Sequence, residues 1–296
     1  MKRLLVLDIG GTSIKYGIWK DDELSGTASI ETPKTWQEMK QIILKLTKQF
    51  DEKIDGVAIS SPGAVDTETG IIYGLSAIDY IHRFPIREEL SNLVKLPVSI
   101  QNDANCAALA EVWQGNAQAV KNSAYLIIGS GIGGAVVIDK QLKAGTHLFG
   151  GEFGYMIIDS QTNQTLSEAG SPVTMARHFS QEKNDGQHYT GREVFTLADN
   201  GDALAKIYVD RLLHALTIGA FNLSVTFDPE VILIGGAISQ NEQVIKEINK
   251  RLKALIKEKE ADGLTPTVKA CHFLDKANML GAVYQFYLEN DPKENP

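Results

Sequence analysis

The sequence predicts an α/β protein of two domains whose mixed β-sheets are flanked by helices. An apolar segment at residues 4–9 runs into two glycines, and an alternating apolar segment follows at 13–19, which is the pattern of two strands joined by a tight turn. The same design recurs at residues 126–138. Elsewhere strand and helix patterns alternate, as is typical of α/β proteins. The 296 residues are enough for two medium domains with a sizeable core.

Apolar periodicity places the elements of the first half of the chain. Residues 30–33 have the pattern of a strand end. One strand leads into a turn-rich loop and another leads directly into a helix, which indicates α/β organisation with mixed sheets. The predicted elements are a helix at 36–50 with Thr35 as its N-cap, a strand at 55–60, a loop at 61–66, a strand at 97–101 and a helix at 104–113.

The passage at residues 116–119 separates the first half from a second domain. We expect the C-terminal helix at 277–288 to return to the first domain, so that residues 1–115 and 277–296 form one domain and residues 116–276 the other. Within the second domain the sequence predicts strands at 231–234 and 267–271, helices at 204–223 and 244–256, and a polar surface loop at 180–192.

The composition is that of a water-soluble protein of a reducing compartment. Hydrophobic residues make up 43% and charged residues 22% of the chain. The net charge of −8 argues against nucleic acid as the main partner. Two distant cysteines, Cys106 and Cys271, do not indicate a disulfide framework. No signal peptide or membrane span is visible, because the N-terminal apolar run is short and contains Asp8, so we expect a cytoplasmic protein without membrane partners.

The first glycine turn has the residue types of a phosphate cradle. Gly10 and Gly11 can turn with positive φ and leave no side chain above the turn, so a polyphosphate could lie against backbone N–H groups. Thr12 adds a hydroxyl donor, and Asp8 at the strand end could hold a metal-bound water near the phosphates. The alternative is an ordinary hairpin with a tolerant turn.

The second glycine turn, at residues 129–134, favours phosphate binding over an ordinary hairpin. Two such hairpins in one chain suggest related halves that face each other across a cleft, each binding one end of a triphosphate. Coincidence in a glycine-rich chain is the alternative. A Walker loop is excluded because no Gly-Lys-Ser/Thr follows, and a dinucleotide fingerprint does not fit because a strand, not a helix, follows the glycines.

Asn102 and Asp103 stand between a strand and a helix. The helix N-terminus is expected to keep a carboxylate there ionised. Asp103 could cap the helix, or it could accept a proton from a substrate hydroxyl, and the two roles compete for the same oxygens. Asp103 is the preferred base because the amide of Asn102 beside it can hold a neighbouring hydroxyl.

Three further spots are open to two interpretations. Glu152 lies among glycines and suits hydrogen bonding to a polyol, or it is a solvated carboxylate in a turn. Glu168 has the position of a first-turn acid in a capped helix, and that structural role is favoured when the segment is read alone. The pair Gly235-Gly236 ends a strand and either admits a flat ring against the backbone or begins the next helix.

Together these motifs resemble the ROK family of repressors, uncharacterised reading frames and sugar kinases, within the actin-like ATPase superfamily. The resemblance spans nearly the whole chain and includes the loop at 61–70 as the sugar-side loop. It implies two actin-like, ribonuclease H-like domains and an ATP-dependent kinase that phosphorylates a hexose or a β-glucoside at O6, with Mg²⁺ as cofactor and a homodimer as the assembly.

The resemblance also assigns roles to individual residues. Asp103 is implied as the catalytic base, and Asp8 as the residue that holds Mg²⁺ through water. The implied sugar-binding residues are Gly63, Asn102, Asp103, Glu152, Tyr155 and Glu168, and the implied ATP-binding residues are Asp8, Gly10, Gly11, Thr12, Lys15, Gly131, Ile132, Gly133, Gly235 and Gly236.

Two departures from the family pattern bear on specificity. Family sugar kinases commonly carry Glu-x-Gly-His, whereas here Tyr155 occupies the histidine position. Neither Cys nor His occurs between Tyr155 and Glu168, so no structural zinc site of the usual ligands is expected. These losses resemble the zinc-less branch of the family, which includes β-glucoside kinases.

Two other functions remain to be weighed against the kinase. Family repressors carry an additional N-terminal DNA-binding domain, and here the first strand begins within a few residues of Met1, which disfavours a sugar-responsive regulator. A non-catalytic sugar-binding relative is the other alternative, and Tyr155 is the feature that favours it.

Overall fold

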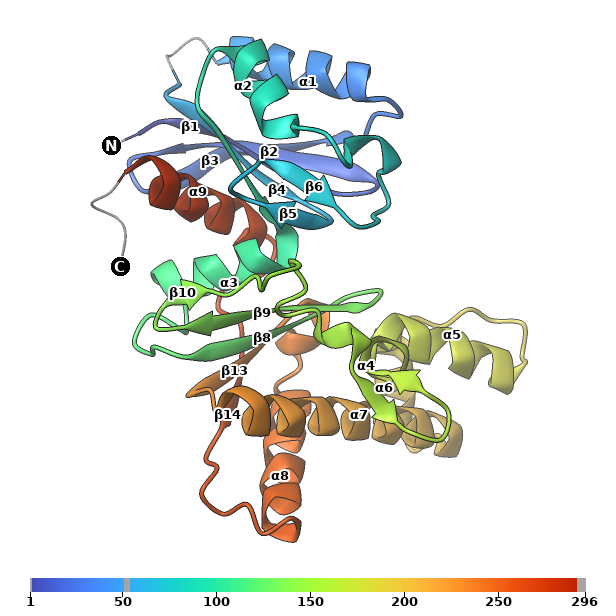
Figure 1. Cartoon of the computed structure of the whole chain (residues 1–296). Helices are drawn as coiled ribbons and strands as arrows, with labels where there is room; N and C mark the ends of the chain where they lie inside the picture. Colours follow the sequence, from blue (N-terminus) through green and yellow to red (C-terminus); the bar gives the residue numbers. More distant parts are fainter. Residues whose placement is uncertain (1, 51–53, 292–296) are drawn as a thin grey trace. The chain divides into compact units, whose positions relative to one another are not determined.

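The computed structural model describes residues 2–50 and 54–291, which fold into two compact units (Figure 1). Unit 1 comprises Met1–Gln118, Gly145–Phe149 and Asp275–Pro296, and unit 2 comprises Ala119–Ala144 and Gly150–Leu274. Each unit is built on one mixed five-stranded sheet flanked by helices, so the predicted fold class is confirmed. Within the described ranges, no helix is long and apolar enough to cross a membrane.

The sheet of unit 1 has a buried central strand. Every residue of β1 (Leu4–Ile9) is buried, because β1 lies between an antiparallel and a parallel neighbour. The strand order is β3-β2-β1-β4-β7, in which the first three strands are antiparallel and the last three parallel. The neighbours of β1 are β2 (Ser13–Lys20) and β4 (Gly56–Ser61), and the edge strands are β3 (Glu23–Glu31) and β7 (Val98–Asn102).

The helices of unit 1 cover this sheet. Helix α1 (Trp36–Gln49) begins at a capping box in which the Thr35 side chain accepts from the backbone N–H of Glu38. Thr35 is therefore confirmed as the N-cap. Helix α9 (Ala277–Asn290) belongs to unit 1 and packs closely on α3 (Asp103–Gln114), since a Cβ at Gly281 would lie 1.7 Å from a backbone oxygen of α3. The remaining elements are β5 (Ala64–Asp66), β6 (Ile71–Tyr73), η1 (Asp79–Ile81) and α2 (Ile86–Val94).

The sheet of unit 2 repeats the topology of the first. Its order is β10-β9-β8-β13-β14, again with the first three strands antiparallel and the last three parallel. The strands are β8 (Ser123–Ile128), β9 (Ile132–Ile138), β10 (Gln141–Leu142), β13 (Val231–Gly235) and β14 (Thr267–Ala270). In both units a glycine turn joins the central strand to its antiparallel neighbour, which agrees with the predicted relation between the two hairpins.

The helices of unit 2 include two that the sequence analysis missed. Residues 180–192 were predicted as a loop, but α5 (Pro172–Lys183) extends into this range and α6 (Gly191–Asp199) begins within it. Helix α6 starts at a capping box between Thr190 and Glu193, which is a signal present in the sequence. The other elements are η2 (Phe153–Tyr155), β11 (Ile157–Asp159), β12 (Gln164–Thr165), α4 (Leu166–Gly170), α7 (Ala203–Phe227), η3 (Ala237–Gln240) and α8 (Glu242–Glu258).

Candidate active site

The first glycine turn exposes its backbone to solvent. The N–H of Gly10 donates to the carbonyl of Ser13 at 3.0 Å and closes the turn. Neither Gly10 nor Gly11 has a positive φ, so the predicted conformational reason for the glycines is wrong. Space is the reason instead, because a Cβ on Gly11 would lie 2.6 Å from Cβ of Ala77. Gly11 and Thr12 are exposed, and in the described part of the chain their N–H groups donate no hydrogen bond.

Asp8 stands at the end of β1 with one oxygen engaged and one available. The side chain is buried, and its Oδ1 accepts from Ser60 Oγ at 2.9 Å and from Asn278 Nδ2 at 3.1 Å. No described residue donates to its Oδ2. Lys15 is exposed and lies opposite Asp8 in the β1–β2 register. This turn therefore presents one carboxylate oxygen and one ammonium group beside open N–H groups.

The environment of Asp8 fits Mg²⁺ held largely by water and phosphate. Mg²⁺ dehydrates reluctantly and is commonly bound through one or two carboxylates together with substrate phosphates. Among the residues that the structure describes, no three His, Cys, Asp or Glu side chains gather into a metal cage. A single available oxygen on a fixed carboxylate is therefore compatible with the predicted water-mediated role of Asp8.

Asn102 and Asp103 divide the two roles that the sequence left open. Asn102 caps α3, because its Oδ1 accepts from the N–H of Asn105 at 3.0 Å. Its Nδ2 donates to the carbonyl of Gly63 at 3.0 Å and to Oδ1 of Asp103 at 3.1 Å. The N–H of Ala104 also donates to this Oδ1, at 2.8 Å. In the described structure Oδ2 of Asp103 accepts nothing, so it is available to a substrate hydroxyl.

The protonation of Asp103 is governed by burial rather than by the helix N-terminus. Burial raises the pKa of the Asp103 carboxyl above its ordinary value of 3.8, and the charge of Asp8 raises it further. The hydrogen bonds from Ala104 and Asn102 act in the opposite direction and do not prevail. Burial therefore outweighs the hydrogen bonds at the helix N-terminus, while the expectation that this carboxylate is ionised stays a prediction. A raised pKa is typical of carboxylates that act as general bases.

Gly63 fixes the loop that lies against Asn102. Its φ is +98°, a conformation that favours glycine, and a Cβ there would lie 2.7 Å from Cγ2 of Ile72. Its carbonyl accepts the Asn102 amide, so Gly63 contributes through its backbone. The structure thus places Asp8, Gly63, Asn102 and Asp103 within unit 1, although they lie up to 95 positions apart in the sequence.

The second glycine turn is tied down from one side and open on the other. The Ser171 hydroxyl donates to the carbonyls of Gly129 and Ser130, at 2.8 and 3.0 Å. A Cβ on Gly129 would meet nothing within 4 Å, and on Gly131 only Oγ of Ser167 at 3.5 Å. The N–H of Ile132 donates to Ser167 Oγ at 2.9 Å, so it is already satisfied. The open side of the turn has room for an anion.

The segment at residues 150–155 packs on β9, immediately after this turn. Gly151 has a φ of +97°, and a Cβ there would lie 2.7 Å from Cα of Ala135. Phe153 is buried, and its ring packs against that of Phe227 at the end of α7. Glu152 is consequently half-buried, whereas Tyr155 is 70% exposed. The close packing fixes the backbone of this segment against β9, where a Cβ on Gly154 would lie 2.1 Å from the carbonyl oxygen of Ile132.

Glu168 is occupied by the helix it begins. Its Oε2 accepts from the N–H of Thr165 at 2.8 Å and from the Thr165 hydroxyl at 2.9 Å, and Thr165 in turn accepts from the N–H of Glu168. These hydrogen bonds from Thr165 lower the pKa of the Glu168 carboxyl. The structural interpretation of Glu168 as a first-turn acid is confirmed, while its role toward a sugar stays a prediction.

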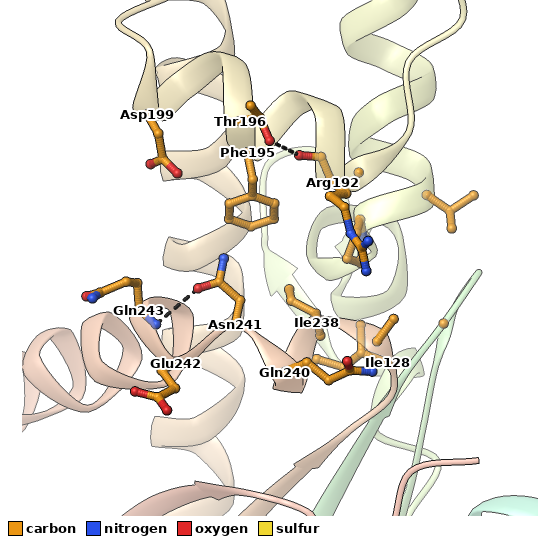
Figure 2. A pocket seen from close by; sticks show the side chains of 15 residues that line it. Ile128, Arg192, Phe195, Thr196, Asp199, Ile238, Gln240, Asn241, Glu242 and Gln243 are labelled. Carbon is orange, nitrogen blue, oxygen red and sulfur yellow. Dashed lines mark hydrogen bonds between the residues drawn. The ribbon is translucent and has the colours of Figure 1, made fainter.

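Directly after the pair Gly235-Gly236, Ala237 and Ile238 line a pocket of about 610 Å³ in unit 2 (Figure 2). Gly236 has a φ of +87°, and a Cβ there would lie 2.0 Å from the carbonyl oxygen of Ile128, so only glycine fits. The chain then turns into η3, which forms one wall, and α6 forms the opposite wall. The lining residues include Ile128, Gly129, Val173, Arg192, Phe195, Asp199, Ile238, Gln240 and Asn241.

The chemistry of this pocket suits a flat heteroaromatic ring. Ile128, Phe195 and Ile238 supply apolar surface, and polar groups from α6 and from the start of α8 lie at its edge (Figure 2). Among the described residues no ion pair reaches the exposed guanidinium of Arg192. Sequence reasoning missed Arg192 and Phe195, because it placed the start of α6 in a loop; the Thr190–Glu193 capping box could have revealed them.

Two sheets of identical topology, each with a glycine turn at the end of its central strand, define the actin-like ATPase class of folds. The chain belongs to the ROK family, whose profile matches residues 4–287. A β-glucoside kinase of Listeria monocytogenes is 32% identical to it, over 99% of this chain and 100% of that protein. A β-glucoside kinase of Klebsiella pneumoniae is 31% identical, over 96% of each. The structure of a ROK family protein from Streptococcus pneumoniae in complex with sucrose has a TM-score of 0.89 at 34% identity, over 98% of this chain and 99% of that one.

Proposed function

We propose that this chain is an ATP-dependent sugar kinase that transfers a phosphoryl group to O6 of a hexose or a β-glucoside. The observation that carries the proposal is Asp103, whose Oδ1 is held by two donors while Oδ2 is available. Its raised pKa brings the carboxylate nearer to the affinity for protons that a general base needs. The β-glucoside kinases among its relatives support the same class of reaction.

Phosphate binding rests on the two glycine turns. In unit 1 the exposed N–H groups of Gly11 and Thr12, with Lys15 nearby, are suited to phosphate oxygens. In unit 2 the N–H of Gly129 closes the turn on the carbonyl of Gly131 and that of Ile132 donates to Ser167, so the N–H groups of Ser130 and Gly131 are the proposed donors to phosphate. The nucleoside would lie in the pocket between α6 and η3, where Phe195 supplies an aromatic face. The two units are accordingly proposed as the two domains of the enzyme, and each would bind phosphate through its own turn.

The acceptor sugar is proposed to bind beside Asn102 and Asp103. Asn102 Nδ2 already donates to Gly63 and Asp103, so its orientation is determined before a substrate arrives. In unit 2, Glu152, Tyr155 and Glu168 stay the proposed sugar-binding residues. Tyr155 is an exposed aromatic side chain in place of the family histidine, and an aromatic face suits the apolar side of a sugar ring or an aglycone.

The enzyme would accelerate the reaction mainly by positioning the sugar hydroxyl and the γ-phosphate. Asp103 Oδ2 takes the proton of the attacking hydroxyl as its oxygen forms the new bond to the γ-phosphorus. The bond between that phosphorus and the oxygen bridging it to ADP breaks in the same transfer. Because such transition states are loose, orientation and charge neutralisation contribute more than proton removal. Mg²⁺, when bound near Asp8, would neutralise phosphate charge. A homodimer and a cytoplasmic location complete the proposal.

An activity screen tests this function directly. ADP formation is measured with hexoses and β-glucosides as acceptors, and the position of the phosphate is read from the product by NMR. The 6-deoxy form of the best substrate is the matched control, and it should be inert if O6 is the acceptor. Sugar binding without turnover for every compound would favour a non-catalytic relative, and a specific, salt-sensitive DNA complex would favour a regulator.

The nucleoside pocket is tested separately. Phe195→Ala should raise the KM for ATP about tenfold, because a stacked base loses about 1–2 kcal/mol of aromatic contact. The KM for the sugar should stay unchanged. Val225→Ala removes an equally apolar but exposed side chain from α7 and serves as the control. An unchanged KM for ATP in the Phe195 variant would place the nucleoside elsewhere.

A further inference from the structure

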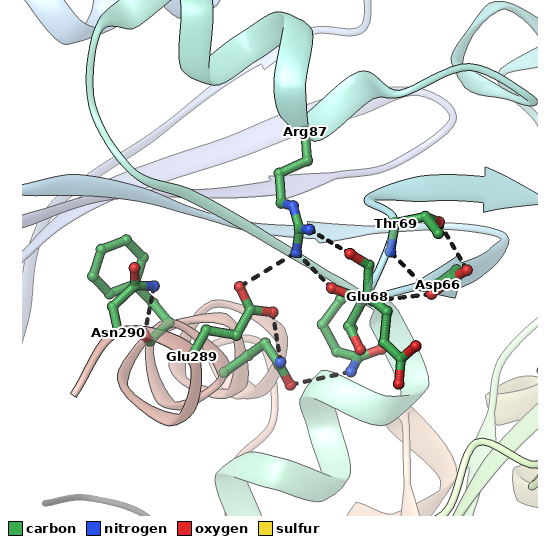
Figure 3. Close-up of polar contacts among 10 residues, drawn as sticks. Asp66, Glu68, Thr69, Arg87, Glu289 and Asn290 are labelled. Atoms are coloured by element: carbon green, nitrogen blue, oxygen red, sulfur yellow. Dashed lines mark hydrogen bonds and ion pairs between the residues drawn. The ribbon is translucent and has the colours of Figure 1, made fainter. Parts of the chain in front are cut away.

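Arg87 clamps the turn of the sugar-side loop (Figure 3). Its guanidinium donates to the backbone carbonyls of Thr67 and Glu68, the latter at 2.7 Å, and its own N–H donates to the carbonyl of Gly70 at 3.2 Å. Asp66 holds the same turn from within, because its carboxylate accepts from two backbone N–H groups and from the Thr69 hydroxyl. The turn at 66–70 is therefore set by Arg87, which belongs to α2.

A chain of side chains runs from Arg87 to the first turn of α3. Glu289 in the last turn of α9 lies 3.7 Å from the Arg87 guanidinium and accepts from Gln285 Nε2 at 2.8 Å. Gln285 Oε1 accepts from Gln101 Nε2 at 3.1 Å. Gln101 Oε1 accepts from the N–H of Asn102 at 2.7 Å and from Asn105 Nδ2 at 3.2 Å.

The hydrogen bonds in this chain have one consistent direction. Each amide accepts with its oxygen on the side of α3 and donates with its nitrogen on the side of Glu289, so Glu289 is the terminal acceptor. Gln101 and Gln285 are buried, and reversing either amide would place two like groups face to face. Burial raises the pKa of Glu289, whereas the Gln285 amide and the Arg87 charge lower it. The pair Arg87–Glu289 thus anchors the orientation of both glutamines.

We infer that Arg87 and Glu289 are positioning residues, which couple the sugar-side loop to the Asn102–Asp103 turn through Gln285 and Gln101. The inference rests on the proposed function for its kinetic consequence. Neither residue touches the reacting groups. Their effect is to keep the N–H of Asn102 fixed at one end of the chain and the carbonyls of residues 67 and 68 fixed at the other, so that the loop and the base move as one body.

A purely structural ion pair predicts something different. Arg87 and Glu289 side chains are 27% and 21% exposed, and pairs with such exposure contribute little to stability. If the pair only stabilised the fold, its loss would lower the melting temperature slightly and leave the kinetics unchanged. A positioning role instead lowers kcat/KM for the sugar, because a small displacement of a catalytic group is costly in rate.

The experiment compares Arg87→Met, Glu289→Gln and the double variant. Each single variant should lower kcat/KM for the sugar about tenfold while the KM for ATP stays within about twofold. The double variant should be no worse than the poorer single variant, because both changes interrupt one chain. Lys40→Met is the control, since it breaks a 3.6 Å ion pair with Glu89 elsewhere in unit 1. Unchanged kinetics, or losses that multiply in the double variant, would overturn the inference.

Amide hydrogen exchange provides a readout that needs no activity. In either single variant the exchange of the Asn102 amide should accelerate about tenfold, and in Lys40→Met it should not change. An unchanged Asn102 amide would contradict the coupling whether or not the protein is a kinase. A wild-type protein without turnover would defeat the proposed function alone. If Arg87→Met does not fold, Glu289→Gln gives the same measurements with a nearly isosteric change.

Discussion

The Asn102 side chain caps helix α3 with its oxygen and holds Oδ1 of Asp103 with its nitrogen, at 3.0 and 3.1 Å respectively. A helix start usually takes its cap from the carboxylate or amide that is nearest to it. Here the amide does this work and leaves the neighbouring carboxylate one oxygen that no described residue engages. The same amide donates to Gly63, so the cap, the base and the loop share a single residue. Because Asn102 caps the helix, the carboxylate of Asp103 can lie at the helix N-terminus and still keep one oxygen available.

Replacing the base tests that division of roles. Asp103→Asn keeps the shape of the side chain but removes the proton acceptor, so we expect kcat to fall by about 10²–10⁴-fold. The affinity for the sugar should change by less than about threefold, because Asn102 retains its contacts. Steady-state kinetics and calorimetric sugar binding measure the two quantities. Near-normal turnover in this variant would remove Asp103 from the role of base.

The raised pKa of Asp103 predicts a pH dependence with a definite sign. The base must be ionised, so kcat/KM should fall as the pH drops through the folded-state pKa, at a higher pH than for an ordinary aspartate. Because the charge of Asp8 contributes to the raised pKa, Asp8→Asn should move this acid limb to lower pH. A pH–rate profile of each protein measures the shift. An acid limb that stays in place in Asp8→Asn would show that the two carboxylates are not coupled.

The same group affects stability in the opposite sense to most carboxylates. Its folded pKa lies above the unfolded value, so the native state binds the proton more tightly than the unfolded chain does. Stability contributed by this group is therefore lost as the pH rises from the unfolded pKa through the folded one. Asp103→Asn should accordingly have the higher melting temperature at neutral pH, and thermal unfolding at several pH values measures the difference.

The fold was predictable where local signals agreed with burial. The central strands and their glycine turns follow from apolar runs that end in glycine, and α1 follows from Thr35 and an apolar stripe. The prediction of a loop at 180–192 was wrong because it gave more weight to the polar composition of the segment than to the capping box at Thr190. Helices such as α6 gain their stability from packing against α7, which periodicity over nine residues does not reveal.

The sequence predicted which residues belong to the candidate site, but it did not predict the contacts between them. Asp8, Asn102 and Asp103 stand at strand ends, and parallel strands bring such residues to one edge of a sheet. The reason for Gly11 was not predictable, because it depends on Ala77 across the turn, a contact between residues 66 positions apart. Gln285 and Glu289 carried no signal either, since a polar residue in a helix usually faces water.

The second glycine turn can be tested with two alanines that differ in space. Gly131→Ala meets only Ser167 Oγ at 3.5 Å, so the variant should fold normally, and its KM for ATP should rise about tenfold because the methyl group occupies the open side. Gly134→Ala would place Cβ 2.4 Å from the carbonyl of Tyr125 and should lose about 1–3 kcal/mol of stability. Thermal unfolding and ATP kinetics separate the two effects. A Gly131 variant with an unchanged KM would show that phosphate does not approach this turn.

The Oε2 of Glu168 is occupied by the backbone N–H and the hydroxyl of Thr165. If the residue only caps α4, Glu168→Gln and Thr165→Ala should each lower the melting temperature and leave the KM for the sugar unchanged, because both weaken the same capping box. If its carboxylate also binds a sugar hydroxyl, as proposed, Glu168→Gln should raise that KM about tenfold beyond the effect of Thr165→Ala.

The capping box of α6 provides a reference for the stability that the capping box of α4 contributes. Thr190→Ala removes the equivalent box from α6, where Glu193 accepts from Thr190 at 2.7 and 2.8 Å. It should cost about 1 kcal/mol, as should Thr165→Ala, because the two boxes have the same geometry. Thermal unfolding compares the two caps and sugar kinetics compare the two glutamates. Equal sugar KM values in Glu168→Gln and Thr165→Ala would reduce Glu168 to a structural residue and leave Gly63, Asn102, Asp103, Glu152 and Tyr155 as the proposed sugar contacts.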